Sequence, residues 1–597
     1  MYEGGLQQPN PYTTDNMKMA LNNIKAKIKT GEYRVVSTQT FKSNSNESSN
    51  STSILAQFSV NTSHLYVKFI PQSEAELALL KRDSTLILSE YPLDFEFDDL
   101  FYENRPELPS GTFPEYFTSV AVNQSLPNVS MIHIADLYIP EEDDFFYPDA
   151  DQPITDKGVI GNEEDLFHHL LFEAYALVGK EDDLTSDHGE IIIPGTTQAK
   201  WIFGRKWQPK GTLKHWDGKA GFSSGGQHCT YGFIGLDYSG CYDNDGTFSD
   251  CPEYVYGWSC VDLPDVQGSF VPLEGAQVLM RQWFTVRQGI SNHNGYFQTK
   301  TVRGKARYIL QWERYEYSIR NGSFFQAETR GPKVKDQPWN PHIQGGDDEY
   351  HAMIHAEAHE YYYGDRMGTI TPPKNSPGNY QMKIAARELN DQSSHIPFFT
   401  YATGGLVAQI MIKAWGDTSD EIYGTTIHEL AHAAHKNITP FSYDDVVADA
   451  YTNVCFTPPI GNCHDPLGPT ANNNRRLLET WATTIETLFT RRRYVEKYGM
   501  TNYSYTLNNF QQREILQNNH YTSAGIDMVE GNYGLPIINQ SLVNSARPID
   551  NVNNYTLEEL EYALIFAQSW WQWRDNIYNY YPNNPSRVHL NQLFNNW

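Results

Sequence analysis

The sequence is poor in positive charge and has no long apolar run. It contains 45 Lys and Arg against 72 Asp and Glu, which gives a formal net charge of -27 at pH 7. Nucleic acid and anionic lipid bind clusters of cations, so this balance disfavours both as non-specific partners. No apolar stretch approaches the roughly 18 residues that span a bilayer. We therefore expect no nucleic-acid partner and no transmembrane segment.

Cysteine is scarce, and none of the six cysteines forms a C-x-x-C pair. A zinc ribbon and a thioredoxin-type motif are therefore disfavoured. The first residues, MYEGGLQQPNPYTTDN, contain neither the basic nor the apolar part of a signal peptide. The even number of cysteines favours disulfides of an exported protein, with buried thiols as the alternative. We expect an extracellular or cell-surface protein whose signal segment has been removed, and we leave open a lipid anchor at the mature N-terminus.

At 597 residues the chain is too long for one hydrophobic core, so a multidomain protein is expected. The patterns change along it, from a polar start to short alternating runs, then to Gly-rich and aromatic-rich segments, and finally to helical periodicity. The expected parts are a tether and helix over 1–30, an N-terminal α+β domain over 31–200, a central all-β sandwich over 201–335 and a mainly α domain over 336–597.

The predicted β-region contains the segments VPLEGAQVLM and GISNHNGYFQT. Asn294 and Gly295 supply the positive φ of a tight hairpin, after which Phe297 re-enters the core. Together with the GA-x-V pattern these segments resemble the carboxypeptidase regulatory-like sandwich family. The resemblance implies a scaffold or spacer module and no catalytic role. The residues that carry it are Gly275, Ala276, Val278, Asn294, Gly295 and Phe297.

The stretch TTIHELAHAAH carries the strongest chemical signal in the chain. His428 and His432 lie four residues apart, so on an α-helix both rings project from one face and can bind one ion. Glu429 lies roughly 100° around the helix, where its carboxylate can take a proton from a metal-bound water. We expect Thr425 and Thr426 to cap this helix, and its apolar residues to form a buried face.

A catalytic zinc site needs a third protein ligand and leaves its fourth position to water. Downstream, an apolar stripe of helical period predicts a buried helix in NNRRLLETWATTIETLFTRRR. Glu479 and Glu486 flank this stripe, and a carboxylate beside Trp481 is explained by a positive charge nearby. We expect Glu479 to be the third ligand and keep Glu486, Asp445 and Asp449 as alternatives.

These residues together resemble the gluzincin class of metallopeptidases, which combines H-E-x-x-H on one helix with a glutamate on a second. The ETWA setting of Glu479 is similar to a branch of exported bacterial proteins. The wider arrangement, including LYVKFIP and YPLDFEF near the start, is similar to uncharacterised surface lipoproteins of Gram-negative bacteria. The resemblance implies a zincin-like fold, a bound Zn²⁺ and a water that attacks the polarised peptide carbonyl.

The sequence departs from better-known relatives of this class. It lacks the G-x-x-H extension of metzincins, the N-E-x-x-S-D setting of thermolysin-like enzymes and the G-x-M-E-N exopeptidase motif. The substrate class therefore does not carry over, and neither does the choice between endopeptidase and exopeptidase. The donor that stabilises the transition-state oxyanion is expected to be a Tyr or a His, without a choice among them.

Further histidines accompany the motif. His435 lies seven residues after His428, about 10 Å along the helix axis, so we expect it beside the site or at the surface. A stripe of three histidines, His351, His355 and His359, is predicted on a helix ended by Gly364. A partly buried polar face is favoured there over a cleft lining or a second metal site.

The run from Leu406 to Lys413 predicts a strand before the metal helix. In zincin folds an edge strand at this place pairs with extended substrate, so we expect peptide to dock near it.

Two functional interpretations follow from these patterns. The first is a secreted or surface-anchored zinc metallopeptidase that acts on protein or peptide substrates. The second is a non-catalytic cell-surface binding or adhesion protein in which the zincin-like part is a scaffold. The first is favoured, because a degenerate peptidase would usually have lost Glu429 or a ligand.

Overall fold

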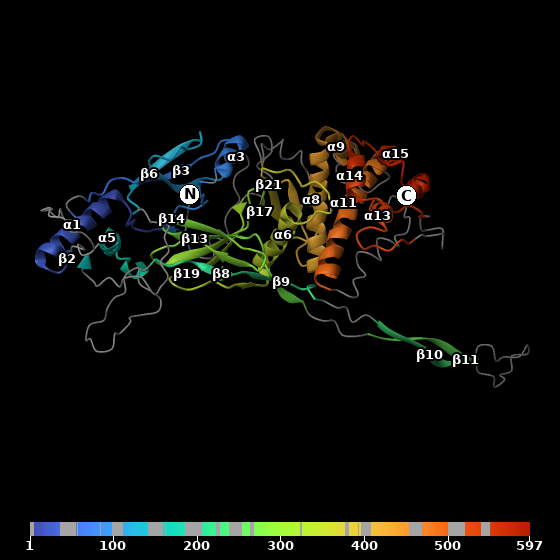
Figure 1. The fold of residues 1–597 in the computed structure, drawn as a ribbon, viewed down its shortest axis with the longest axis horizontal. Helices are drawn as coiled ribbons and strands as arrows, with labels where there is room; N and C mark the ends of the chain where they lie inside the picture. The colour runs from blue at the N-terminus through green and yellow to red at the C-terminus, as the bar shows by residue number, and fades with distance from the viewer. Residues whose placement is uncertain are drawn as a thin grey trace, which may run out of the picture. The chain divides into compact units, whose positions relative to one another are not determined.

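The structure is a computed structural model of the chain (Figure 1). It describes residues 5–35, 55, 58–83, 85–97, 112–140, 159–160, 163–184, 206–221, 227–237, 253–262, 268–322, 325–375, 381–391, 393–395, 408–452, 469–499, 520–538 and 550–597. The chain forms two compact units. Unit 1 comprises Met1–His215, Pro272–Asp365 and Thr371–Trp415, and unit 2 comprises Trp216–Val271, Arg366–Ile370 and Gly416–Trp597. Helices and several sheets are both present, as the sequence predicts for a mixed, multidomain protein.

The first part of unit 1 is built on a three-stranded antiparallel sheet with the order β5-β3-β6. In the central strand Tyr66 faces one apolar cluster, whereas Val67 and Phe69 face another, because successive side chains point to opposite faces. Helices α1 and α5 fill the first cluster and α3 contributes to the second. The elements are α1 (Thr14–Thr30), β3 (His64–Phe69), α3 (Glu74–Arg82), β5 (Tyr116–Ala121), β6 (Met131–Leu137) and α5 (Glu163–Leu177).

Short elements complete this part of unit 1. Two pairs of two-residue strands, β1 with β4 and β2 with β7, tie distant stretches together. Gly31 ends α1 in the left-handed conformation with φ 79°. The low-complexity stretch KSNSNESSNSTS lies outside the described residues. The bounds are β1 (Leu6–Gln7), β2 (Arg34–Val35), β4 (Phe95–Glu96), β7 (Val159–Ile160), η1 (Glu181–Leu184) and β8 (Lys210–Thr212).

A four-stranded antiparallel sheet, β14-β13-β16-β19, forms the centre of unit 1. Gly295 has the expected positive φ, 75°, and a Cβ there would lie 2.2 Å from a backbone carbonyl oxygen, but Asn294 does not have a positive φ. The strand that follows, β15, pairs with β8 and not with β14, so the expected hairpin is not the pairing in the sheet. Phe297 follows in β15 and is buried, as expected. The four strands are β13 (Gln277–Gln282), β14 (Thr285–Ile290), β16 (Ala306–Gln311) and β19 (Glu328–Val334), while β15 (Tyr296–Gln298) pairs with β8 in a separate sheet.

A five-stranded mixed sheet, β18-β17-β21-β23-β22, follows in unit 1 and packs against α6. Strands β17, β21 and β23 run parallel, and every residue of β21 is buried, which is typical of parallel strands covered on both faces. Gly364 ends α6, as the sequence predicts. The elements are β17 (Tyr317–Asn321), β18 (Phe325–Gln326), β20 (His342–Ile343), α6 (Gly346–Tyr363), β21 (Met382–Ala386), β22 (Ser394–His395) and β23 (Ile410–Ile412).

Unit 2 is mainly helical around α8 and α11, which pack along each other (Figure 1). Smaller helices pack on this pair, among them α13 and α15 on α11 and α14 on α8. The helices are α8 (Ser419–Ile438), α9 (Pro440–Val447), η2 (Ala448–Thr452), α11 (Pro469–Arg491), η3 (Arg492–Lys497), α13 (Ala524–Val529), α14 (Leu557–Leu564), α15 (Trp570–Tyr580), η4 (Pro585–His589) and α16 (Leu590–Asn596). No helix in the described part of the chain is both long and apolar enough to cross a bilayer.

Unit 2 also contains a hairpin of β10 (Gln227–Asp237) and β11 (Glu253–Asp262). Cys229 and Cys260 lie opposite each other in its register. The other four cysteines lie outside the described residues. The two remaining strands, β9 (Lys214–Asp217) and β12 (Ser269–Pro272), lie where the chain ranges of the two units meet.

Two local predictions are wrong. Thr425 and Thr426 lie inside α8, because the helix begins a turn and a half earlier, where Glu421 accepts hydrogen bonds from the backbone N–H (2.9 Å) and hydroxyl (2.7 Å) of Thr418. The expected substrate-pairing strand is β23, of which the structure describes Ile410–Ile412. It pairs with β21 on one side and β22 on the other, so it is not an edge strand and offers no free backbone to a peptide.

The two units divide the chain differently from the four expected parts. Unit 1 joins 1–215 to 272–365 and 371–415, so it combines the expected tether, the α+β domain, much of the β-region and the start of the last part. The reason is that hydrogen bonds and apolar clusters join these ranges, as where the Ser119 hydroxyl donates to the Phe284 carbonyl at 2.7 Å.

Breaking the ion pair between α3 and β21 is expected to destabilise unit 1 strongly. The Lys383 ammonium donates to both carboxylate oxygens of Glu74 at 2.9 Å, and both residues are 6% exposed. Burial lowers the pKa of Lys383 to about 8 although Glu74 raises it. Glu74→Gln should reduce the free energy of unfolding by about 3–5 kcal/mol, because it removes the carboxylate that accepts two hydrogen bonds from a buried cation.

Chemical denaturation checks this, with Glu115→Gln as the matched control. Glu115 pairs with Lys68 at 2.9 Å near the surface, so its loss should cost less than about 1 kcal/mol. Equal losses in the two variants would contradict the prediction.

Candidate metal centre

Helix α8 presents the two motif histidines from a buried helix. Its apolar side chains, among them Ile427, Leu430 and Ala434, are fully buried. His428 and His432 are 9% and 7% exposed, and their ring centroids lie 4.8 Å apart. The i, i+4 spacing thus places both imidazoles on one face, as predicted.

Helix α11 supplies the carboxylates that face α8. The predicted apolar stripe is buried along its whole length. Three buried threonine hydroxyls, at Thr484, Thr487 and Thr490, each donate to the carbonyl four residues earlier at 2.6–2.7 Å. These internal bonds satisfy polar groups within the helix and let it pack closely on its neighbours. The stripe consists of Leu477, Leu478, Trp481, Ile485, Leu488 and Phe489.

Three donor atoms converge between the two helices. The Glu479 Oε2 lies 3.1 Å from the His428 Nε2 and 3.5 Å from the His432 Nε2, and the two imidazole nitrogens lie 3.2 Å apart. A tetrahedral zinc with ligand bonds of about 2.0–2.1 Å holds its donor atoms about 3.3 Å apart. Two imidazoles and one carboxylate are a ligand set that catalytic zinc uses. The residues present therefore fit a zinc ion.

Glu486 contacts the far side of His428 and does not belong to the converging donors. Its Oε2 lies 3.0 Å from the His428 Nδ1. A carboxylate there accepts the Nδ1 proton, which fixes the ring and leaves Nε2 as the metal-binding atom. Gly424 permits this approach, because a Cβ at that position would lie 3.0 Å from the Glu486 Oε1. The sequence predicts Glu486 as an alternative ligand, whereas its position suits an orienting role.

Tyr451 orients the third ligand. Its hydroxyl donates to the Glu479 Oε1, which leaves Oε2 directed at the histidines. Tyr451 lies in the π-helical turn η2, a distortion that is frequent at functional sites because it re-aims side chains. Burial, together with the Glu479 carboxylate, raises the pKa of Tyr451 well above its ordinary value. The tyrosine therefore stays protonated and keeps donating.

Glu429 is buried beside the histidines with one carboxylate oxygen unused. It is 6% exposed, and among the described residues its Oε2 has no hydrogen-bond partner. Burial raises the pKa of Glu429, while the His428 and His432 rings act in the opposite direction. A buried carboxylate with an unsatisfied oxygen is suited to accept a proton from a nearby water.

The charges at this site are strongly coupled. Burial alone would lower the pKa of His428, but its hydrogen bonds to Glu479 and Glu486 outweigh burial and raise the pKa well above its ordinary value. Burial alone would raise the pKa of Glu479, but the two histidines outweigh it and hold the pKa well below its ordinary value. The protein itself thus favours an anionic carboxylate against cationic or metal-bound imidazoles.

Other sequence candidates lie apart from the converging donors. Asp445 and Asp449 are exposed and do not belong to the group formed by the histidines and Glu479. His435 is 2% exposed, so the expectation that it might lie at the surface is wrong, and its ring packs edge-on against Tyr443 at 5.0 Å. Burial lowers the pKa of His435 to about 3, so this imidazole is neutral.

The histidine stripe on α6 belongs to the core of unit 1. The two ring nitrogens of His355 lie 3.2 Å from the Tyr317 hydroxyl and 3.1 Å from the Glu274 carbonyl oxygen. Burial lowers the pKa of His351 to about 4 and that of His355 well below its ordinary value. His359 stacks on His355 with the centroids 6.0 Å apart. Among the described residues the groups of converging donors do not include these rings.

A second acidic group lies elsewhere in unit 2. Asp527, Glu530 and Asp550 are each 1–2% exposed, and one oxygen of each lies within 4.8 Å of the others. Burial and mutual repulsion raise the pKa of Asp527 well above its ordinary value, and burial raises that of Asp550 to about 6. This acidic group contains no imidazole, whereas catalytic zinc sites use histidine ligands. The candidate zinc site is therefore the group of His428, His432 and Glu479.

Sequence reasoning missed Tyr451 and Gly424, and it named Glu486 as an alternative ligand and not as an orienting group. Tyr451 lies two residues after Asp449, and nothing in its spacing signals a π-turn. Gly424 lies one turn before His428, and a glycine inside a helix is the usual signal of a close approach. Glu486 lies seven residues after Glu479, a spacing that places both carboxylates on one face.

Glu486→Ala is expected to weaken zinc binding by about 10–100-fold, because it removes the group that orients His428. Titration against a chromophoric chelator measures this. Glu496→Ala is the matched control, since Glu496 is an exposed partner of Arg491 at the end of α11. Gly424→Ala should cause a smaller loss, because its Cβ displaces the Glu486 carboxylate. Unchanged affinity in Glu486→Ala would contradict an orienting role.

Asp550→Asn is expected to stabilise unit 2 at neutral pH. The folded-state pKa of Asp550, about 6, lies above its ordinary value of 3.8, so the folded protein binds more protons between these values. The contribution of Asp550 to the free energy of unfolding is therefore fully present below about pH 4 and is lost as the pH rises through 6. Removing the charge should raise the free energy of unfolding at pH 7 by about 1–3 kcal/mol and flatten this decline.

Denaturation from pH 4 to 7.5 in chelator tests it, with Asp575→Asn as the exposed control. Lower stability of Asp550→Asn at pH 7 would show that a positive partner compensates the carboxylate.

Comparison with known proteins adds no relative to this picture. No protein-family model, no curated protein and no solved structure matches the chain. The resemblance to gluzincins therefore depends on the motif residues themselves, and the function has to be inferred from the converging donors and their surroundings.

Proposed function

We propose that the protein is a secreted or surface-anchored zinc-dependent metallopeptidase. The observation that carries this proposal is the convergence of the His428, His432 and Glu479 donor atoms at 3.1–3.5 Å beside the buried carboxylate of Glu429. The histidines come from one helix and the third donor from a second helix 51 residues away in the sequence. Coincidental pairing of polar residues does not explain why Glu429 and a carboxylate partner for His428 are also in place.

The roles of the residues follow from their positions. The two histidines and Glu479 would hold the ion. When bound, a zinc ion acts as a Lewis acid, which lowers the pKa of a coordinated water and polarises the peptide carbonyl. Glu429 takes the proton of the attacking water as a general base and then donates it to the leaving amine. Glu486 and Tyr451 are positioning residues, since each acts through a ligand. No covalent intermediate with the chain is required.

A donor for the transition-state oxyanion completes the proposal. Tyr451 is committed to Glu479, which leaves Tyr521 as the better candidate among the described residues. Its ring lies 6.0 Å from that of His428, and its side chain is 44% exposed, as a residue facing substrate requires. Burial is the main cause that lowers the pKa of the neighbouring His520 to about 4. This imidazole is therefore neutral and is a weaker donor.

The same proposal includes an assignment of the domains and a location outside the cell. An N-terminal α+β domain, a central β-sandwich and a C-terminal zincin-like domain, with the boundaries expected from the sequence, would form a spacer and a catalytic part. The sheet around β21, backed by α6 and followed by the metal helix α8, supports the zincin-like assignment. Proteins or peptides outside the cell are the proposed substrates, and disulfides would suit that compartment.

A non-catalytic binding or adhesion protein is the second candidate. It is supported by large exposed aromatic side chains, such as Phe566 at 71% and Tyr562 at 56%. In that case the zinc site would be structural, and Glu429 would have no role. The intact Glu429 with its unused oxygen favours the peptidase.

Glu429→Gln is expected to abolish hydrolysis while zinc stays bound. The amide preserves the shape of the side chain but does not accept the proton, so we expect cleavage of a mixed peptide library, read by mass spectrometry, to fall at least 10³-fold. Tyr521→Phe should lower kcat with a smaller effect on KM, because its hydroxyl acts in the transition state. Glu421→Gln, at the start of the same helix, is the control for helix integrity.

Hydrolysis that survives Glu429→Gln would overturn the mechanism. A wild type that binds zinc and cleaves no peptide would favour the binding protein.

A further inference from the structure

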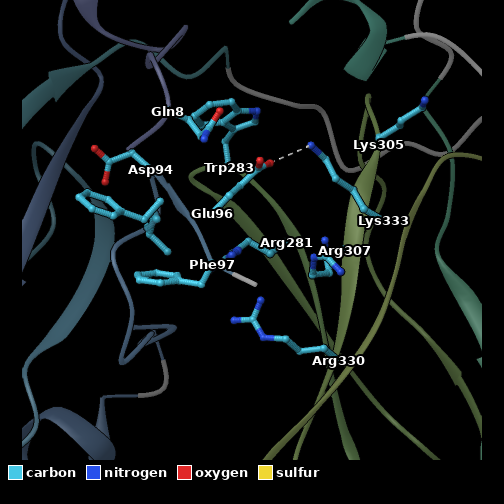
Figure 2. A pocket seen from close by; sticks show the side chains of 12 residues that line it. Gln8, Asp94, Glu96, Phe97, Arg281, Trp283, Lys305, Arg307, Arg330 and Lys333 are labelled. Atoms are coloured by element: carbon cyan, nitrogen blue, oxygen red, sulfur yellow. Dashed lines mark ion pairs between the residues drawn. The ribbon is translucent and has the colours of Figure 1, made fainter. Parts of the chain in front are cut away.

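A cavity of about 170 Å³ in unit 1 gathers positive charge (Figure 2). Five of its twelve lining residues are Lys or Arg, and two are Asp or Glu. This balance is the opposite of that of the whole chain, whose net charge is -27. On an acidic protein we expect cationic side chains to be paired with carboxylates, so the excess of cations over acids in this cavity has to be explained.

The cations are aligned across one sheet. Arg281 of β13 lies opposite Arg307 of β16, and Arg307 lies opposite Lys333 of β19. Directly opposed residues have Cβ atoms about 4.5–5.5 Å apart, so like charges there repel. A register shift between Arg307 and Ile309 adds one residue on β19, which lets Arg330 and Lys333 both line the cavity. The sheet thus places four cationic groups on one wall.

The protein compensates only part of this charge. Lys333 pairs with Asp183 at 2.7 Å and with Glu96 at 3.7 Å. The two carboxylate oxygens of Asp94, which also lines the cavity, accept hydrogen bonds of 2.9 Å from the Tyr66 hydroxyl and the Gln7 amide. These acids therefore serve other partners.

The two facing arginines have no such partner. Among the described residues neither Arg281 nor Arg307 forms an ion pair, and Arg307 donates only to the carbonyl of Gly331, at 3.1 Å. About two positive charges are left for a ligand.

Aromatic side chains border the cationic wall. Figure 2 shows Phe97 beside Arg281, and Trp283 lines the same cavity next to Gln8. Trp283 has φ 50° in the two-residue turn between β13 and β14, where Asn or Gly is preferred. A side chain other than Gly in this conformation costs about 1–2 kcal/mol, and such strain clusters at ligand sites. The Trp283 ring packs against the rings of Tyr175 and Phe284, each with the centroids 6.4 Å apart.

We propose that this cavity binds an organic dianion, with a phosphate monoester as the best match. The two unpaired guanidinium groups would bind the phosphoryl oxygens, for which their planar donor pairs are suited. A phosphate monoester carries about -1.5 to -2 charges at pH 7, which matches the two arginines. Trp283 and Phe97 would contact the apolar part of the ligand. The site lies in unit 1 and is independent of the zinc proposal.

Calorimetry on the full chain at low ionic strength tests this proposal with three probes, inorganic phosphate, phenyl phosphate and phenyl sulfate. We expect phenyl phosphate to bind most tightly, because it has both the charge and a ring for the aromatic border. Arg281→Gln and Arg307→Gln should each weaken its binding at least tenfold. Arg287→Gln on β14, which does not line the cavity, should leave it unchanged.

Stability without ligand supplies a second readout. In phosphate-free buffer Arg281→Gln should raise the midpoint of thermal unfolding, because it relieves the repulsion from Arg307. Arg281→Lys keeps the charge and loses the paired donors, so it should fold and bind phenyl phosphate with intermediate affinity. This variant preserves the test if Arg281→Gln fails to fold.

Several results would overturn the proposal. Equal affinity of wild type and the arginine variants for phenyl phosphate would show binding elsewhere, and no binding at millimolar concentration would exclude the site. Preference for phenyl sulfate would contradict the dianion. A lower unfolding midpoint in Arg281→Gln would show that the protein itself compensates this charge.

Discussion

The contact between α8 and α11 is the constraint on which the candidate centre depends. It brings two imidazole nitrogens and a carboxylate oxygen within 3.5 Å of one another in a largely buried place. Burying ionisable groups costs several kcal/mol unless an opposite charge compensates them. A divalent cation would provide that compensation and would add bonds to all three donors. The neighbouring residues bind the atoms that point away from the converging donors. Glu486 accepts from the Nδ1 of His428, and Tyr451 donates to the Oε1 of Glu479.

Local patterns in the sequence predicted the parts of this site that depend on helical period. The i, i+4 spacing of the histidines and the apolar stripe of α11 follow from 3.6 residues per turn. Glu479 followed from its place beside that stripe. The orienting contacts were not predictable, because Glu486 and Tyr451 reach their partners through packing between helices and through a π-turn. The two carboxylates of α11 look alike in sequence, and only the contact with α8 separates a converging donor from an orienting group.

The errors in the fold have the same origin. Thr425 and Thr426 were expected to cap α8 because threonine is a favoured cap residue, whereas the helix begins at Ser419. The strand after residue 406 has the expected type, but its neighbours in the sheet come from distant stretches of the chain. Whether a segment forms a strand depends on its local sequence. Whether that strand lies at the edge or in the interior of a sheet depends on the strands that pair with it. The same holds for the cationic cavity, whose arginines are far apart in the sequence and meet only through strand register.

The zinc content of the purified protein tests the central claim most directly. After dialysis against a weak chelator, mass spectrometry of wild type and Glu479→Ala compares a site of three donors with a site of two. The account predicts about one zinc per wild-type chain and little in the variant. No zinc in the wild type, or an equal amount in the variant, would contradict it.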